Sequence, residues 1–119
     1  MPILANFVIA LVAIIHIYIM ILEMFLWDKP TGLRAFGQTH EQATASKVLA
    51  ANQGLYNGFL AAGLIWSLWL GADGSSVKLF FLSCVLIAGI YGAATANKKI
   101  LFIQAIPAAI GLTLVLLIY

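Results

Sequence analysis

The sequence predicts an all-α membrane protein, a polytopic bundle of four transmembrane helices with both termini on the extracytoplasmic side. The first reason is composition: 64% of the 119 residues are hydrophobic and 8% are charged, against about 45–50% and about 25% in soluble domains. The second is four apolar segments of about 20 residues, the length that crosses a bilayer. The third is an uneven distribution of lysine and arginine. These observations exclude a soluble enzyme and a disordered chain, and a net charge of +2 is too small for a nucleic-acid surface.

The four expected spans are residues 3–27, 48–70, 77–96 and 100–119, within a single domain of residues 1–119. Helices are predicted because these runs lack the period-two alternation of barrel strands and because a helix satisfies its own backbone hydrogen bonds in lipid. The first span lacks the basic start and the small-residue cleavage site of a secretory signal, so we expect it to be retained.

The connections differ in length and polarity. Residues 28–47 form the long polar connection, whose first part, residues 28–32, is typical of a turn. Thr39 and Gln42 fit a capping box, which predicts that the second helix begins near His40, before it enters lipid. Short turns at residues 71–76 and 97–99 join the remaining spans.

Basic residues give the expected orientation, because cytoplasmic loops of membrane proteins are enriched in lysine and arginine. The 28–47 and 97–99 connections together hold five basic residues, and the opposite side holds only Lys78. Trp27 at the inner end of the first span, with Trp66 and Trp69 near the outer end of the second, fits the aromatic belts of a bilayer. We therefore expect a multi-pass protein of a bacterial inner or plasma membrane, with both connections in the cytoplasm.

Two ionisable side chains stand out in the first span. His16 and Glu23 are seven residues apart, which places them within about 20° of one helix face. Ionisable groups inside a membrane are rare and are functional candidates by default. A structural interpretation is also open, in which His16 bonds a neighbouring helix and Glu23 reaches the interface or pairs with Arg34 or Lys47.

The second span carries a polar stripe made of three amides and a phenol: Asn52, Gln53, Tyr56 and Asn57. Hydrogen bonds between membrane helices contribute only about 0.6 kcal/mol on average, so four such groups on one stripe are hard to explain by stability. The stripe is therefore a candidate for binding a ligand, and a hydrogen-bond network between helices is the alternative.

The same span carries a stripe of small residues, Gly54, Gly58 and Ala62, which is typical of close helix packing in membranes. At about 100° per residue this stripe lies almost opposite the polar one. We therefore expect the polar stripe to face His16 and Glu23 of the first span, and the small stripe to touch another helix.

The last two spans add secondary candidates. Tyr91 and Gln104 are expected to line the same polar site, and Pro107 predicts an irregular helix because it removes a backbone hydrogen bond. Cys84 is the only cysteine, and with no paired Cys/His spacing no metal site is expected. A second row of small residues is expected to pack against a helix: Ala88, Gly92 and Ala96.

Three blocks of this sequence resemble a family of small bacterial four-span membrane proteins known as domain of unknown function thirteen-oh-four. The blocks are residues 23–27, 32–37 and 47–63, and residues 52–60 are the most specific part. The resemblance covers nearly the whole chain and implies an integral four-helix protein, without supplying an activity. Small multidrug transporters and the membrane-associated glutathione enzymes are similar in size and span number, which is an analogy of fold alone.

Several functions remain open at this point. The first is binding of, or catalysis on, a small amphipathic or lipid-like molecule in a polar site between the first two spans. The second is proton-coupled transport through Glu23, by a transporter or one of its subunits. The third is a structural or partner-binding role, including self-association, through the rows of small residues. Haem ligation by His16 is weaker, because no second axial candidate lies in a span, and the sequence indicates neither a reaction nor a cofactor.

Overall fold

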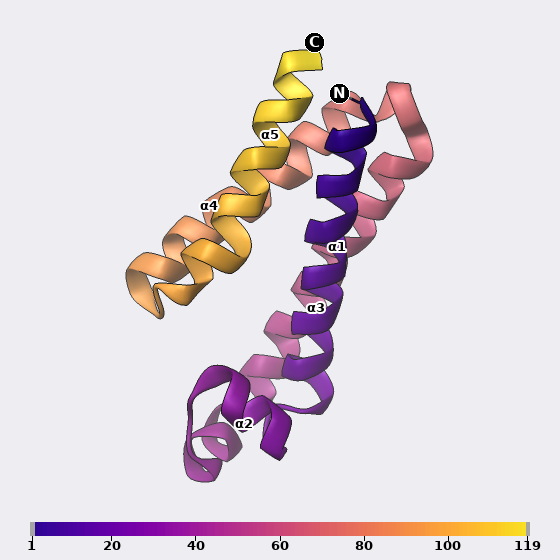
Figure 1. Ribbon diagram of the computed structural model, residues 1–119. Coiled ribbons are helices and arrows are strands. Elements are labelled where there is room, and N and C mark those ends of the chain that lie inside the picture. The colour runs from indigo at the N-terminus through magenta and orange to yellow at the C-terminus, as the bar shows by residue number, and fades with distance from the viewer. Residues whose placement is uncertain (1, 119) are drawn as a thin grey trace. The chain divides into compact units, whose positions relative to one another are not determined.

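The computed structural model describes residues 2–118, and within them the chain is all α-helical, as predicted. It divides into two compact units. Unit 1 contains residues 2–15 and 60–118, and unit 2 contains residues 16–59. The elements, labelled in Figure 1, are α1 (Pro2–Phe25), α2 (Pro30–Phe36), α3 (His40–Leu70), the 3₁₀ turn η1 (Gly71–Gly74), α4 (Ser75–Thr95), the π turn η2 (Leu101–Ala105) and α5 (Ile106–Ile118).

Three helical stretches of the described chain are long and apolar enough to cross a membrane: Pro2–Phe25, His40–Thr95 and Leu101–Ile118. The second stretch contains both α3 and α4, which η1 separates. The four expected spans therefore correspond to α1, the later part of α3, α4, and η2 followed by α5. Tyr119, the last residue of the fourth expected span, lies outside the described residues.

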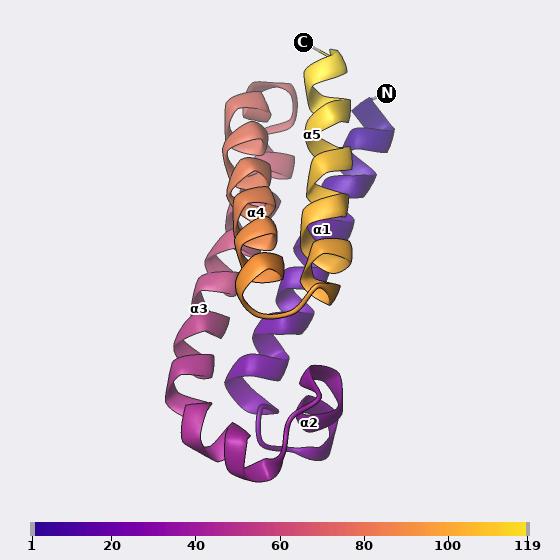
Figure 2. The same cartoon turned by 90° about the vertical axis from the view of Figure 1, so that its left-hand side faces the viewer.

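Unit 1 packs four helical segments around one apolar core. The segments are the first half of α1, the last part of α3, α4 and α5, and α4 and α5 lie side by side after a short turn (Figure 2). The largest fully buried side chains of this core are aliphatic: Ile9, Val12, Leu64, Leu82, Val85 and Val115. Apolar burial on one face of each segment explains why these stretches pack with each other.

The contact between α4 and η2 is made at Gly89. A Cβ atom at this position would lie 2.8 Å from the backbone nitrogen of Ala105, so the two backbones approach closely only because residue 89 is glycine. The expected packing row of Ala88, Gly92 and Ala96 is therefore wrong. Ala88 and Ala96 are exposed, and the buried row of α4 contains Lys78, Leu82, Val85 and Gly89.

The irregularity predicted ahead of Pro107 takes the form of the π turn η2. The backbone N–H of Ile106 donates to the carbonyl of Leu101, five residues earlier. Proline has no N–H and its ring crowds the carbonyl four residues before it, and π turns are a known way to absorb such a disturbance within a helix.

Unit 2 contains the end of α1, α2 and the start of α3. The turn expected at residues 28–32 lies instead at residues 26–29, because Pro30 begins α2. Proline is favoured in the first turn of a helix, where its missing N–H costs nothing. Gly37 ends α2 in the left-handed conformation, with φ of 61°, and its N–H donates to the carbonyl of Leu33.

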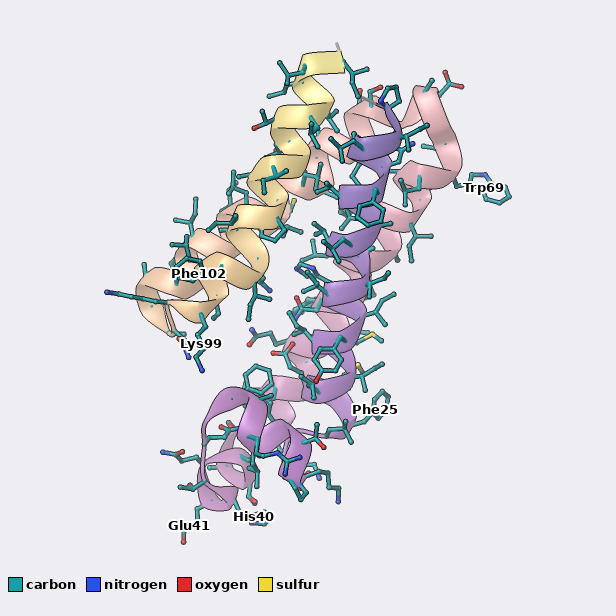
Figure 3. All side chains as sticks on the ribbon, viewed as in Figure 1. Phe25, His40, Glu41, Trp69, Lys99 and Phe102 are labelled. Atoms are coloured by element: carbon teal, nitrogen blue, oxygen red, sulfur yellow. The ribbon has the colours of Figure 1, made fainter. Side chains whose placement is uncertain are left out.

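The capping box at the start of α3 is confirmed. The Thr39 backbone N–H donates to Gln42 Oε1 at 2.9 Å, and the Gln42 backbone N–H donates to Thr39 Oγ1 at 3.2 Å. The helix therefore begins at His40, as the sequence predicts. The side chains of His40 and Glu41 project outward from this first turn (Figure 3).

Candidate functional site at Glu23 and Asn57

Within unit 2, the end of α1 runs antiparallel to α3 and packs directly on its glycines. A Cβ at Gly54 would lie 2.7 Å from Met24 Cγ and 3.2 Å from the backbone oxygen of Met20. A Cβ at Gly58 would lie 2.8 Å from Met20 Sδ. Gly54 thus lets the backbones of α1 and α3 approach, as small residues do between membrane helices, and Gly58 leaves room for the side chain of Met20.

Glu23 and Asn57 meet in this glycine-lined contact. Asn57 Nδ2 donates a hydrogen bond of 2.5 Å to Glu23 Oε1, and the two side chains are only 7% and 4% exposed, respectively. No described residue donates a hydrogen bond to the second carboxyl oxygen, Oε2. An ionised carboxylate accepts hydrogen bonds at both oxygens, so this group retains the capacity to bind a donor.

The other members of the polar stripe do not join this pair. Asn52, Gln53 and Tyr56 are exposed, and the glycine stripe, which was expected to touch a different helix, faces α1 itself. The expected arrangement of the two stripes is therefore wrong. At about 100° per residue, Asn57 lies about 60° from Gly54, whereas Asn52 lies about 160° from it, so only Asn57 reaches the carboxylate.

His16 is fully buried but lies away from the pair. Seven residues of helix separate it from Glu23, which corresponds to about 10 Å along α1. Although they share a helix face, the imidazole and the carboxylate are too far apart to contact the same small group of a ligand. His16 stays a candidate ligand-binding residue by prediction.

The remaining predicted residues belong to unit 1. Tyr91 on α4 is 71% exposed, and Gln104 in η2 is half-buried. Ala62 is exposed, and a Cβ at Gly92 would meet only the side chain of Ile100, at 3.2 Å. The ligand-lining roles of Tyr91 and Gln104 stay predictions.

Two neighbouring contacts join the end of α1 to α3 beside the pair. Lys47 Nζ donates to Asp28 Oδ2 at 3.0 Å, and Trp27 Nε1 donates to Ser46 Oγ at 3.1 Å. The Trp27 ring also packs on Phe36 of α2, with 4.8 Å between ring centroids. Lys47 therefore pairs with Asp28 and not with Glu23, which was one of the structural alternatives.

The Asp28–Lys47 pair makes the stability of unit 2 depend on pH. The hydrogen bond from Lys47 holds the pKa of Asp28 below its ordinary value, so the pair stabilises the fold above the ordinary aspartate pKa of about 3.9. This stabilisation is lost as the pH falls through the lowered pKa. Acidification toward pH 3 should therefore lower the unfolding free energy of the wild type more than that of an Asp28→Asn variant. Unfolding of both proteins, measured across this pH range, tests the prediction. Equal pH dependence of the two proteins would contradict this.

Lys78, which the sequence analysis used only for the orientation, is a buried charge. It is largely buried, and its Nζ donates to Asn6 Oδ1 at 3.0 Å and to the backbone oxygen of Gly71 at 3.2 Å. Gly71 follows the last residue of α3, where the helix dipole favours a positive charge. Lys78, Leu82 and Val85 lie on one helical face by their spacing, and this is the signal from which the burial of Lys78 could have been predicted.

A family model described as "Protein of unknown function (DUF1304)" matches residues 10–116. The chain belongs to this family. The match includes Glu23 and Asn57, and it confirms the resemblance found in the sequence.

An "Uncharacterized protein YpaA" of Lactococcus lactis subsp. lactis (strain IL1403) is similar to this member of the family. It is 35% identical over 96 residues, which are 79% of this chain and 81% of that protein. No solved structure gives a significant match.

Proposed function

We propose that the protein is an integral membrane protein that binds a small amphipathic molecule at the Glu23–Asn57 pair. One observation carries the proposal: a carboxyl group lies buried between two apolar helices, and Asn57 bonds only one of its two oxygens. Ionisable groups within membrane helices are costly, and they are typically found where a substrate or ion is bound.

The surroundings of the pair suggest the chemistry of the ligand. A carboxylate with an open oxygen favours a group that donates a charge-assisted hydrogen bond, such as a protonated amine. Met20 and Met24 lie beside the pair, against the two glycines. Methionine side chains are flexible and adapt to apolar groups of different shape. The ligand class supported best is therefore an amphipathic amine, with its apolar part against the methionines.

The placement in a bacterial membrane, with residues 28–47 in the cytoplasm, is part of the same proposal. The apolar helices support insertion, and the excess of basic residues in the 28–47 and 97–99 connections supports the orientation. Trp69, near the end of α3, projects outward (Figure 3), as aromatic side chains do in the belts at the membrane surface.

Binding of a dansyl-labelled long-chain primary amine to the protein in lipid nanodiscs should depend on Glu23. We expect Glu23→Gln to weaken binding by more than tenfold, because a hydrogen bond to a charged group is worth about 1.5–3 kcal/mol. The matched control is Glu41→Gln, which neutralises an exposed carboxylate at the start of α3 and should leave affinity unchanged. Equal affinity of the wild type and the Glu23→Gln variant would contradict the proposal.

A further inference from the structure

Three polar side chains lie exposed on one face of α3 in unit 2. They are Asn52, Gln53 and Tyr56, and Tyr56 is 56% exposed. At about 100° per residue they occupy an arc of about 100°, and we call them the amide–phenol stripe. No described residue forms a hydrogen bond with any of the three side chains.

The neighbours of the amide–phenol stripe on the same face of α3 are apolar and exposed. Val48 and Leu49 precede it and are 83% and 74% exposed, and Phe59 follows it and is also exposed. The Phe59 and Tyr56 rings pack with 6.0 Å between centroids. Exposed aliphatic and aromatic side chains on both sides are typical of a surface in contact with lipid. In the proposed membrane placement, the amides therefore lie in the second span, where lipid offers them no hydrogen-bond partner.

Leaving the amide–phenol stripe against lipid is unfavourable. Each amide has two donors and an acceptor oxygen, and the phenol has one donor and an acceptor. Polar groups without partners in an apolar medium cost several kcal/mol. Another protein surface that supplies donors and acceptors removes this cost, because amide side chains hydrogen-bond across membrane helices.

We propose that the amide–phenol stripe of α3 is the surface through which two copies of this chain pair in the membrane. An amide carries both donor and acceptor, so the stripe is complementary to itself. Self-complementarity is what a twofold interface requires, since the same patch is then used on both subunits. The glycine stripe does not serve this purpose, because Gly54 and Gly58 already pack on α1.

The interface is separate from the proposed binding site. Asn57 and Glu23 are buried in the contact between α3 and α1, whereas the three side chains of the amide–phenol stripe are exposed. Pairing through Asn52, Gln53 and Tyr56 therefore does not depend on whether a ligand binds to the carboxylate. The two proposals can fail independently.

Cysteine cross-linking in native membranes tests the proposed interface. Cys84 is the only native cysteine, so it is first replaced by alanine. Asn52→Cys or Tyr56→Cys is then introduced separately, which gives proteins with a single thiol in the stripe. We expect disulfide-linked dimers on mild oxidation. The matched control is Ile21→Cys, on the exposed face of α1 at about the level of Asn57, which should give none. Equal cross-linking at Ile21→Cys, or none at either stripe position, would overturn the proposal.

A second measurement is energy transfer between labelled chains in liposomes, which reports dimers. The double variant Asn52→Leu/Gln53→Leu changes only exposed side chains of α3. It should weaken dimer affinity by about threefold for each hydrogen bond lost. Dansyl-amine binding serves as the parallel readout and should stay unchanged. Unaltered energy transfer in the double variant contradicts pairing through the stripe. Loss of amine binding would instead identify the stripe as part of a ligand site and would also overturn the proposal.

Discussion

Replacing Gly89 with alanine should destabilise the protein, whereas the same replacement at Gly92, three residues along α4, should be neutral or stabilising. A Cβ at Gly89 would lie 2.8 Å from the nitrogen and 3.0 Å from the Cα of Ala105, both backbone atoms of η2. Relief of this contact needs the two helices to separate, and overpacking of this kind costs about 1–3 kcal/mol.

Gly92 is the matched control for this steric argument. A Cβ there would meet only side-chain atoms of Ile100, at 3.2 Å and beyond, and a side chain can adjust. Alanine is also favoured over glycine inside a helix by about 1 kcal/mol. Unfolding of both variants in mixed micelles, followed by circular dichroism, measures the difference. Equal stability of the two variants would show that α4 and η2 do not approach at Gly89.

Replacing Asn57 with leucine should destabilise the protein by about 1.5–3 kcal/mol, the value of a hydrogen bond to a charged group. The variant leaves the buried Glu23 carboxylate without its amide donor. Removing both partners, with Glu23→Leu added to Asn57→Leu, should restore most of the lost stability. A buried polar pair replaced by apolar side chains of similar size is often neutral.

The double-mutant cycle of Glu23 and Asn57 separates a functional pair from a structural one. Unfolding free energies of the wild type, both single variants and the double variant give the coupling energy. A double variant as stable as the wild type but unable to bind the dansyl amine would show that the pair is kept for binding. A double variant less stable than either single variant would contradict this prediction.

Local chemistry explains what could be predicted from the sequence. The capping box at Thr39 and Gln42, the turns around residues 71–76 and 97–99, and the irregularity before Pro107 all depend on residues within one or two helical turns. Such signals need no knowledge of tertiary packing. The starts and ends of α3 and α4 were therefore predictable to within a few residues.

The packing partner of each helix face could not be predicted in the same way. A helical wheel correctly placed Gly54 and Gly58 on one stripe, but it does not say which helix that stripe meets, and the partner is α1. In α4 the spacing of Ala88, Gly92 and Ala96 matched a packing motif, yet Gly89 is the residue in close contact. Small residues are frequent in membrane helices, so spacing alone does not single out the row that packs.

Buried polar groups were the other source of error. Lys78 was considered only as the one basic residue on the extracytoplasmic side, and its burial was not predicted. Its acceptors are Asn6, which is distant in sequence, and Gly71, which lies in a turn. Asn57 was grouped with three amide and phenol neighbours, although only its side chain reaches Glu23. Tertiary contacts decide such cases, since a long polar side chain is buried only where partners are available.

Two adjacent hydrogen bonds beyond the end of α1 hold the first turns of α3 in place. Trp27–Ser46 and Asp28–Lys47 fix both ends of the intervening segment at neighbouring points. Lengthening a closed segment costs only about 0.6 kcal/mol for each doubling. The exposed Gly37, where a Cβ would meet no atom within 4 Å, lies between these two ends. An insertion directly after Gly37 should therefore leave the register of α1 and α3 unchanged.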